Sequence, residues 1–148
     1  MAKEKKGPKS LIPSDRSKTP KIEYHENWQE MRPSWRIGLL EMVEPFGWHK
    51  ASASESFQVK ERLANFESMT WKQILIQGSY RNHSIRKDRL CPEAQQRLED
   101  LGQDDIDAVM SLAVTQKGRI FGIMEHNVLK IIWWNPNHLI CPAPLKNT

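Results

Sequence analysis

Residues 109–134 read VMSLAVTQKGRIFGIMEHNVLKIIWW, and this stretch decides the fold. Its segments 109–115, 119–125 and 128–134 are rich in Val, Ile and aromatic residues, which favour strands. Two short connections join the segments, Gln116-Lys117-Gly118 and His126-Asn127. A two-residue turn suits the second connection because Asn tolerates the positive φ that such turns require. The stretch therefore predicts a small antiparallel β-meander.

Side-chain alternation along these strands predicts one apolar face. The two-residue turn pairs Glu125 with Val128 and Arg119 with Trp134. A three-residue first turn, with Gly118 in the left-handed conformation, keeps the apolar residues of all three strands on the same side. The side that we expect to pack on helices holds Met110, Leu112, Val114, Ile120, Gly122, Met124, Leu129, Ile131 and Trp133.

The opposite face of the predicted meander mixes apolar and basic side chains. An apolar patch with few helices left to cover it is typical of an interaction surface, so we expect a partner to bind there. Two alternatives remain: the Trp-rich N-terminal segment or a second copy of the chain covers this face. The residues of this face include Phe121, Ile123, Val128, Ile132 and Trp134, with Arg119 and Lys130 among them.

Four helices are expected before the meander. Pro33 suits the first turn of one helix, which Pro45 ends. A second helix begins near residue 52, and Thr70 caps a third. Pro92 begins the fourth, over residues 93–101, which ends at Gly102. The predicted fold class is α+β, with N-terminal helices packed on one face of the antiparallel meander.

The positive charge of the chain is concentrated at its N-terminus. The 148 residues carry a net charge of +4, but residues 1–21 hold seven basic residues against two acidic ones, so residues 22–148 carry a net charge of −1. Residues 1–21 also contain three prolines and few bulky apolar residues, a composition typical of disorder. We predict a disordered basic tail over residues 1–21, either simply solvated or gripping nucleic acid or a partner, and a single folded domain over residues 22–148.

Several classes of protein are disfavoured by composition. No apolar run approaches the roughly 18 residues of a membrane span, and no apolar core of a signal peptide is present at the N-terminus. Cys91 and Cys141 suit two reduced thiols. Without a Cys-x-x-Cys pair, a zinc site would have to combine these cysteines with His126 or His138. We therefore expect a cytoplasmic protein that does not associate with a membrane and binds no metal or cofactor.

Residues 79–90 form the one basic cluster within the predicted domain. Asp88 is the only acidic residue of this run. The run is either an ordinary solvated connection or a loop that contacts phosphates, with Tyr80 and His83 available to stack on bases. Its basic residues are Arg81, Arg86, Lys87 and Arg89.

A candidate catalytic pair lies at one end of the predicted hairpin. His126 lies about 20 Å from Arg119 at the rise of a strand, so these two side chains belong to different sites. The sequence Asn135-Pro136-Asn137-His138 suits a type I turn that returns His138 towards Arg119. An imidazole that moves a proton beside a guanidinium that stabilises phosphate charge is suited to phosphodiester chemistry. The alternative is structural: Arg119 stacks on Trp134, and His138 caps the turn.

The order of these motifs resembles a group of small bacterial proteins. In that group a block reading Arg-x-aromatic-Gly is followed by Trp-Trp-Asp-Pro-x-His and by a later Pro and Lys. Here the corresponding residues are Arg119-Ile120-Phe121-Gly122, then residues 133–138, then Pro142 and Lys146. Asn135 stands where that pattern has Asp, which argues against a catalytic carboxylate at this position. The resemblance extends weakly back to residues 69–71 and 94–98, about half of the chain.

The layout of that group is similar to the RelE/ParE toxin superfamily, whose members pack helices on a small antiparallel sheet. Many of those proteins cleave messenger RNA on the ribosome, others poison gyrase, and each is silenced by an antitoxin peptide that lies over the sheet. The resemblance implies a phosphate-binding role for Arg119 and an acid/base role for His138. Because folds host many functions, it supports the fold better than the activity.

The leading hypothesis is therefore a RelE-like toxin that acts on RNA, on or off the ribosome, and is neutralised by an antitoxin over the exposed sheet face. Nucleic-acid or partner contacts are expected from Lys130, Trp134 and Phe121 and from the basic run of residues 79–90. One alternative is a non-enzymatic protein-interaction module of bacterial or phage origin. Another is a nucleic-acid-binding protein without catalysis, which uses the tail and the same basic run.

Deletion of residues 1–21 tests the prediction for the tail. The melting temperature should stay almost unchanged, because this segment can bury little apolar surface. Differential scanning calorimetry of the truncated and full chains measures the difference. A drop of many degrees would show that the segment is docked on the domain.

Overall fold

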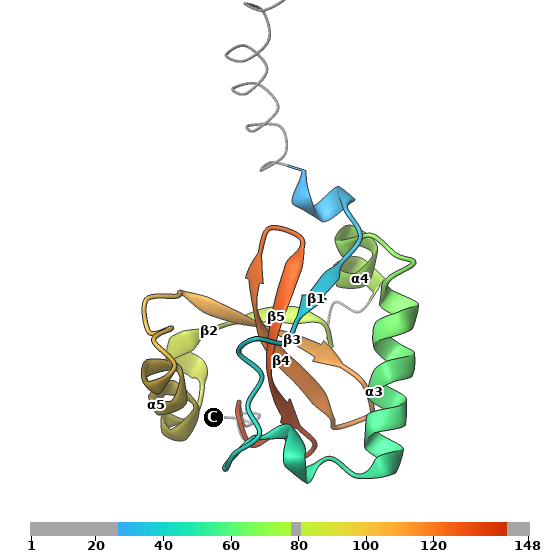
Figure 1. Ribbon diagram of the computed structural model, residues 1–148. Coiled ribbons are helices and arrows are strands. Elements are labelled where there is room, and N and C mark those ends of the chain that lie inside the picture. The colour runs from blue at the N-terminus through green and yellow to red at the C-terminus, as the bar shows by residue number, and fades with distance from the viewer. Residues whose placement is uncertain (1–26, 78–80, 142–148) are drawn as a thin grey trace, which may run out of the picture.

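The computed structural model describes residues 27–77 and 81–141, so the predicted tail over residues 1–21 lies outside the described residues. This part of the chain is α+β, with three α-helices and a five-stranded mixed sheet (Figure 1). The sheet order is β1-β5-β4-β3-β2. The strands are β1 Ser34–Arg36, β2 His83–Arg86, β3 Ala108–Ala113, β4 Arg119–Glu125 and β5 Val128–Asn135. The helices are α3 Ala53–Phe66, α4 Trp71–Gln77 and α5 Pro92–Asp100.

The predicted antiparallel meander is present as β3, β4 and β5. Glu125 pairs with Val128, which confirms the two-residue turn, although the positive φ of 57° falls on His126 instead of Asn127. The predicted pairing of Arg119 with Trp134 is wrong, because Arg119 pairs with Asn135. A β-bulge between these two strands causes the difference.

The bulge consists of one extra residue in β5, Ile132. Phe121 pairs with Trp133 and the next residue, Gly122, pairs with Ile131, so Ile132 has no partner in the register. An extra residue shifts the alternation of every side chain that follows it. Trp133 and Trp134 therefore exchange the faces that strict alternation predicts.

The prediction that the helices cover one face of the meander is wrong for α5, which packs on the opposite face from α3 and α4. The side that faces α3 and α4 is otherwise as predicted. Its buried residues pack with Val59 and Phe66 of α3 and with Trp71 and Ile74 of α4. Trp134 belongs to this cluster, whereas Trp133 belongs to the cluster on the other side of the sheet. The confirmed members are Met110, Leu112, Val114, Ile120, Leu129 and Ile131, with Met124 packed at the edge.

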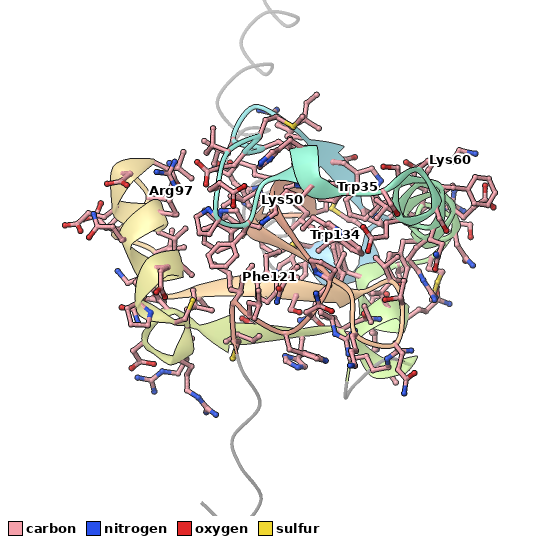
Figure 2. The ribbon with its side chains drawn as sticks, turned by 90° about the horizontal axis from the view of Figure 1, so that it is seen from below. Trp35, Lys50, Lys60, Arg97, Phe121 and Trp134 are labelled. Carbon is pink, nitrogen blue, oxygen red and sulfur yellow. The ribbon has the colours of Figure 1, made fainter. Side chains whose placement is uncertain are left out.

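The second face of the sheet is also buried, so the prediction of an exposed aromatic face is wrong. Phe121, Ile132 and Trp133 lie here and are at most 2% exposed. Phe46, Ile140 and the inward side of α5 cover them. Figure 2 shows Arg97 of α5 and Lys60 of α3 on opposite sides of the molecule, with Phe121 and Trp134 between them.

Residues 34–36 form β1, so the helix predicted between Pro33 and Pro45 is wrong. β1 runs parallel to β5, with Ser34 opposite Val128. Beyond β1 the chain keeps bonding to β5: the Glu41 backbone N–H donates to the Ile132 carbonyl at 3.0 Å, and the Trp134 N–H donates to the Phe46 carbonyl at 3.2 Å. These backbone groups are thus satisfied along the edge of β5 and not within a helix.

The other helices begin where their capping residues predict. Ser52 and Glu55 form a capping box at the start of α3, and the Thr70 hydroxyl accepts a hydrogen bond from the Gln73 N–H at 3.2 Å at the start of α4. α5 begins at Pro92, and Gly102 follows it with a φ of 71°. None of the helices in the described ranges has the length and apolar content needed to cross a membrane.

The β3–β4 connection is longer than predicted. Ala113 pairs with Arg119, and the Val114 N–H donates to the Gly118 carbonyl at 2.9 Å. Gly118 is not left-handed, because Gly102 is the only described glycine with a positive φ. A Cβ at Gly118 would instead lie 2.7 Å from the Trp134 ring, so close approach and not φ requires glycine here.

A buried polar contact joins α5, β5 and the segment after β1. The Glu41 carboxylate is 6% exposed and accepts hydrogen bonds from Arg97 Nε at 3.1 Å and from Trp133 Nε1 at 3.0 Å. Arg97 Nη2 donates to the second oxygen of the same carboxylate. Both oxygens of the Glu41 carboxylate therefore have hydrogen-bond partners, which the burial of a charge requires.

Replacement of Trp133 by Ala should lower the free energy of unfolding by about 3–5 kcal/mol, because the indole is fully buried and also satisfies Glu41. Phe57, which is 65% exposed on α3, is the matched control, and Phe57→Ala should change the stability by less than about 0.5 kcal/mol. Urea denaturation of both variants measures the difference. Equal losses would contradict the placement of Trp133.

Candidate functional site

Arg119 is the first residue of β4 and lies on the α5 side of the sheet, as does Phe121 two residues later. Its Nη1 atom donates to three carbonyl oxygens of the β3–β4 connection, those of Thr115 at 3.0 Å, Gln116 at 3.1 Å and Gly118 at 3.0 Å. These hydrogen bonds stabilise the conformation of the β3–β4 connection. The proposed stacking of Arg119 on Trp134 is not seen, because Trp134 stacks on Trp48 with ring centroids 5.6 Å apart.

The turn after β5 carries His138 back towards Arg119. The Asn135 side chain, which is 1% exposed, accepts a hydrogen bond from the Leu139 N–H at 3.0 Å and closes the turn. His138 has a φ of 62°. Its imidazole pKa is lowered by burial first and then by the positive charges of Arg119 and Lys117. His138 thus lies within the electrostatic reach of Arg119, as the turn sequence led us to expect.

A second imidazole, that of His83, also lies near Arg119. His83 pairs with Ser111 of β3, and Ser111 pairs with Phe121 of β4, so the three residues share one face of the sheet. The pKa of His83 is lowered by burial and by the charge of Arg119. Sequence reasoning gave His83 a base-stacking role in a loop and did not place it beside Arg119.

Other cations surround the β3–β4 connection. Arg81 Nη2 donates to the Thr115 carbonyl at 2.6 Å, and Arg62 Nη2, from α3, donates to the Val114 carbonyl at 3.3 Å. Burial and the neighbouring charge of Arg81 lower the pKa of Arg119. We call Arg62, Arg81, Lys117 and Arg119 the cationic rim. Across the described ranges, no carboxylate lies within ion-pair distance of these four side chains.

The remaining candidate residues lie elsewhere. Phe121 and Trp134 are buried in the two cores. Lys130 is paired with Glu125 at 3.2 Å, near the opposite end of the β4–β5 hairpin. Tyr80 lies outside the described residues.

The basic run of residues 79–90 is not one continuous patch. It contains the edge strand β2, which runs from His83 to Arg86 and separates Arg81 from Lys87 and Arg89. Arg86 pairs with Asp88 at 2.6 Å, and Lys87 donates to the Asp104 carbonyl. Arg89 follows in a short 3-10 helix and is exposed. Within this run, Arg81 alone belongs to the cationic rim.

The positive charges near the two imidazoles, that of Arg119 near both and that of Lys117 near His138, suit a phosphate group. Several guanidiniums without carboxylate partners attract an anion, and each guanidinium keeps donors beyond those bound to the carbonyls. The two imidazoles have pKa values below that of free histidine, so near neutral pH they are mainly uncharged and can accept a proton. Within residues 27–77 and 81–141, no three His, Cys, Asp or Glu side chains gather as a metal site.

Comparison with known proteins assigns no function to this site. No protein-family model matches the sequence, and neither a curated protein nor a solved structure shows significant similarity to it.

Replacement of Arg119 by Gln should raise the pKa of both His83 and His138, because a nearby positive charge disfavours the protonated imidazole. Lys117→Gln should raise the pKa of His138 and leave that of His83 unchanged. Titration of the imidazole resonances by NMR measures both values. Unchanged pKa values in the Arg119 variant would show that the three side chains do not form one site.

Proposed function

We propose that this chain is a RelE-like, toxin-type protein that cleaves RNA at a phosphodiester bound on the cationic rim. The observation that carries the proposal is the position of Arg119, whose charge acts on the imidazoles of both His83 and His138. Arg81 and Lys117 add positive charge around the same place. Such a cluster has both parts of a phosphodiester-cleaving site, an anion clamp and groups that transfer protons.

The reaction would be attack of the RNA's own 2′-hydroxyl on the adjacent phosphorus. One neutral imidazole accepts the 2′-hydroxyl proton while the O2′–P bond forms. The other imidazole, protonated beside the bound phosphate, donates its proton to the 5′ oxygen as the P–O5′ bond breaks. Arg119 stabilises the negative charge that develops on the phosphate oxygens. The products are a 2′,3′-cyclic phosphate and a free 5′-hydroxyl.

The electrostatics support the division of protonation states between the two imidazoles. In the free protein, burial and Arg119 lower the pKa of each ring, which favours the neutral base. A bound phosphate brings a negative charge that raises the pKa of a nearby imidazole, which favours the acid. One site thus supplies both forms near neutral pH.

The proposed antitoxin binds a different surface from the sheet face that the sequence led us to expect. The sheet face over which it was expected to lie is covered by α5, Phe46 and Ile140. In the present proposal an acidic segment of the antitoxin covers the cationic rim and excludes RNA by occupying the same donors. The interaction-module alternative loses the exposed aromatic face that motivated it.

One observation favours a second candidate, an RNA-binding protein without catalysis. Arg119 Nη1 already donates to three carbonyl oxygens, as a purely structural guanidinium would. In that case the rim binds phosphates and the imidazoles take no part in chemistry. Mutation of the histidines separates the two candidates.

His83→Ala and His138→Ala should each lower the rate of RNA cleavage by roughly 10²–10⁴-fold, the usual effect of removing a positioned acid/base group. Arg119→Ala should lower it by roughly 10²–10³-fold, the usual effect of removing a donor that stabilises developing charge. His126→Ala, at the far end of the hairpin, is the control and should cleave RNA at the wild-type rate. The measurement is cleavage of a labelled single-stranded RNA by purified protein, with growth inhibition on induced expression as a second readout. Circular dichroism verifies that each variant is folded.

Two outcomes would contradict the proposal. Full cleavage by the His83 and His138 double variant would show that these groups are not catalytic. A wild-type protein that binds RNA without cutting it, on and off the ribosome, would favour the non-catalytic candidate.

A further inference from the structure

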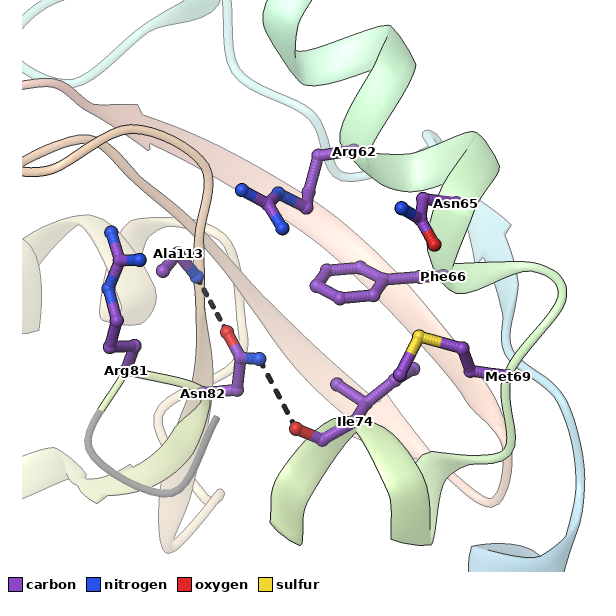
Figure 3. A pocket seen from close by; sticks show the side chains of 8 residues that line it. All are labelled: Arg62, Asn65, Phe66, Met69, Ile74, Arg81, Asn82 and Ala113. Atoms are coloured by element: carbon purple, nitrogen blue, oxygen red, sulfur yellow. Dashed lines mark hydrogen bonds between the residues drawn. The ribbon is translucent and has the colours of Figure 1, made fainter. Parts of the chain in front are cut away.

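A pocket of about 260 Å³ opens next to the cationic rim, between α3, α4 and the strands β2 and β3 (Figure 3). It is smaller than the roughly 300–1,000 Å³ of sites for drug-sized ligands, so it suits a single small group. Arg62 and Arg81 belong both to the rim and to the pocket lining. The pocket and the rim therefore share two guanidiniums.

The lining is cationic and contains no acidic residue. Arg62 comes from α3 and Arg81 from the chain just before β2, and Figure 3 shows the two guanidiniums on different sides of the opening. Each donates through Nη2 to a carbonyl oxygen of the β3–β4 connection. Because a guanidinium has five N–H donors, each keeps others for a ligand.

One wall of the pocket is apolar and partly flat. Phe66, Met69 and Ile74 form this wall (Figure 3). The Arg62 guanidinium carbon lies 5.9 Å from the centroid of the Phe66 ring. The Phe66 ring is only 4% exposed and lies beneath the Arg62 guanidinium, so the guanidinium plane is the surface on which an unpaired base can stack.

Two asparagines give the pocket different polar groups. Both polar atoms of the Asn82 side chain already have a partner, because its amide oxygen accepts from the Ala113 N–H at 2.8 Å and its amide nitrogen donates to the Ile74 carbonyl at 3.2 Å. It fixes the floor by joining α4 to β3. The Asn65 side chain at the mouth is exposed, and in the described structure its amide has no hydrogen-bond partner. That amide can donate to and accept from the edge of a base.

We propose that this pocket binds one unpaired base of the RNA, stacked on the Arg62 guanidinium that lies over Phe66, while Arg81 holds its phosphate. The inference rests on the proposed function, since it names the nucleotide next to the cleaved phosphodiester. A bare anion would use the two guanidiniums but not the apolar wall or Asn65. A paired base is excluded by the size of the pocket, so the target is single-stranded.

The test compares a single-stranded RNA hexamer with a ribose-phosphate hexamer of equal length that lacks bases. The proteins are the full-length chain and its variants Arg62→Gln and Asn65→Ala. Lys60→Gln is the matched control. This replacement also removes one positive charge from α3, but at a side chain that is 73% exposed. Fluorescence polarisation at several salt concentrations gives the affinities, and amide chemical shifts with adenosine 5′-monophosphate locate the base.

The wild type should bind the RNA roughly 5- to 150-fold more tightly than the abasic strand, the range for stacking of one base. Arg62→Gln and Asn65→Ala should reduce this ratio, whereas Lys60→Gln should leave the ratio unchanged. Arg81→Gln should lower the salt dependence of log K by about 0.7, as expected for the loss of one single-strand phosphate contact. The mononucleotide should shift the amide resonances of residues 65–69.

Equal affinity for the two strands in the wild type would overturn the inference, even if the protein cleaves RNA at the rim. Binding of the mononucleotide in the pocket by a protein that cleaves no RNA would keep the base site and reject the proposed cleavage. An Asn65→Ala variant with an unchanged ratio and no amide shift at residues 65–69 would also overturn the base site.

Discussion

The extra residue in β5 determines how the two layers around the sheet are joined. Because Ile132 is unpaired in the β4–β5 register, the consecutive indoles of Trp133 and Trp134 enter opposite cores. The carbonyl of Ile132 is also used twice, since it accepts from the Glu41 N–H at 3.0 Å and from Trp48 Nε1 at 3.2 Å. One bulge therefore fixes the path of the segment after β1 and the division of the aromatic core.

The same bulge determines which side chains lie near Arg119 at the end of the β4–β5 hairpin. The shift in alternation places Asn135 opposite Arg119 and on its side of the sheet. The side chain of Asn135 then closes the turn that brings His138 towards Arg119. With strict alternation, Trp134 would have occupied the position beside Arg119. The bulge thus exchanges an aromatic neighbour of Arg119 for a turn that carries an imidazole.

Local patterns predicted the elements whose stabilisation is local. The meander followed from alternation and a two-residue turn, and the starts of α3 and α4 followed from Ser52 and Thr70 as capping residues. β1 and β2 were missed because each has only three or four residues and at most one large apolar side chain. Their partners lie far along the chain, as in the pairing of Ser34 with Val128. The turn sequence after β5 predicted that His138 lies near Arg119. The positions of His83 near Arg119 and of Arg62 in the cationic rim depend on contacts between residues far apart in the sequence and were not predicted.

The two strands at the edges of the sheet have a consequence for the behaviour of the protein at high concentration. β1 is three residues long and ends in the exposed Arg36, and β2 carries His83, Ser84 and Arg86 around a single apolar residue. Short edges with charged side chains are poor templates for a strand from another copy. Three of the four aromatic residues of the sheet lie in its central strands, and the fourth, Trp35 of β1, is half-buried against the Trp71 ring. The fold thus protects an unusually Trp-rich sheet from edge-to-edge aggregation.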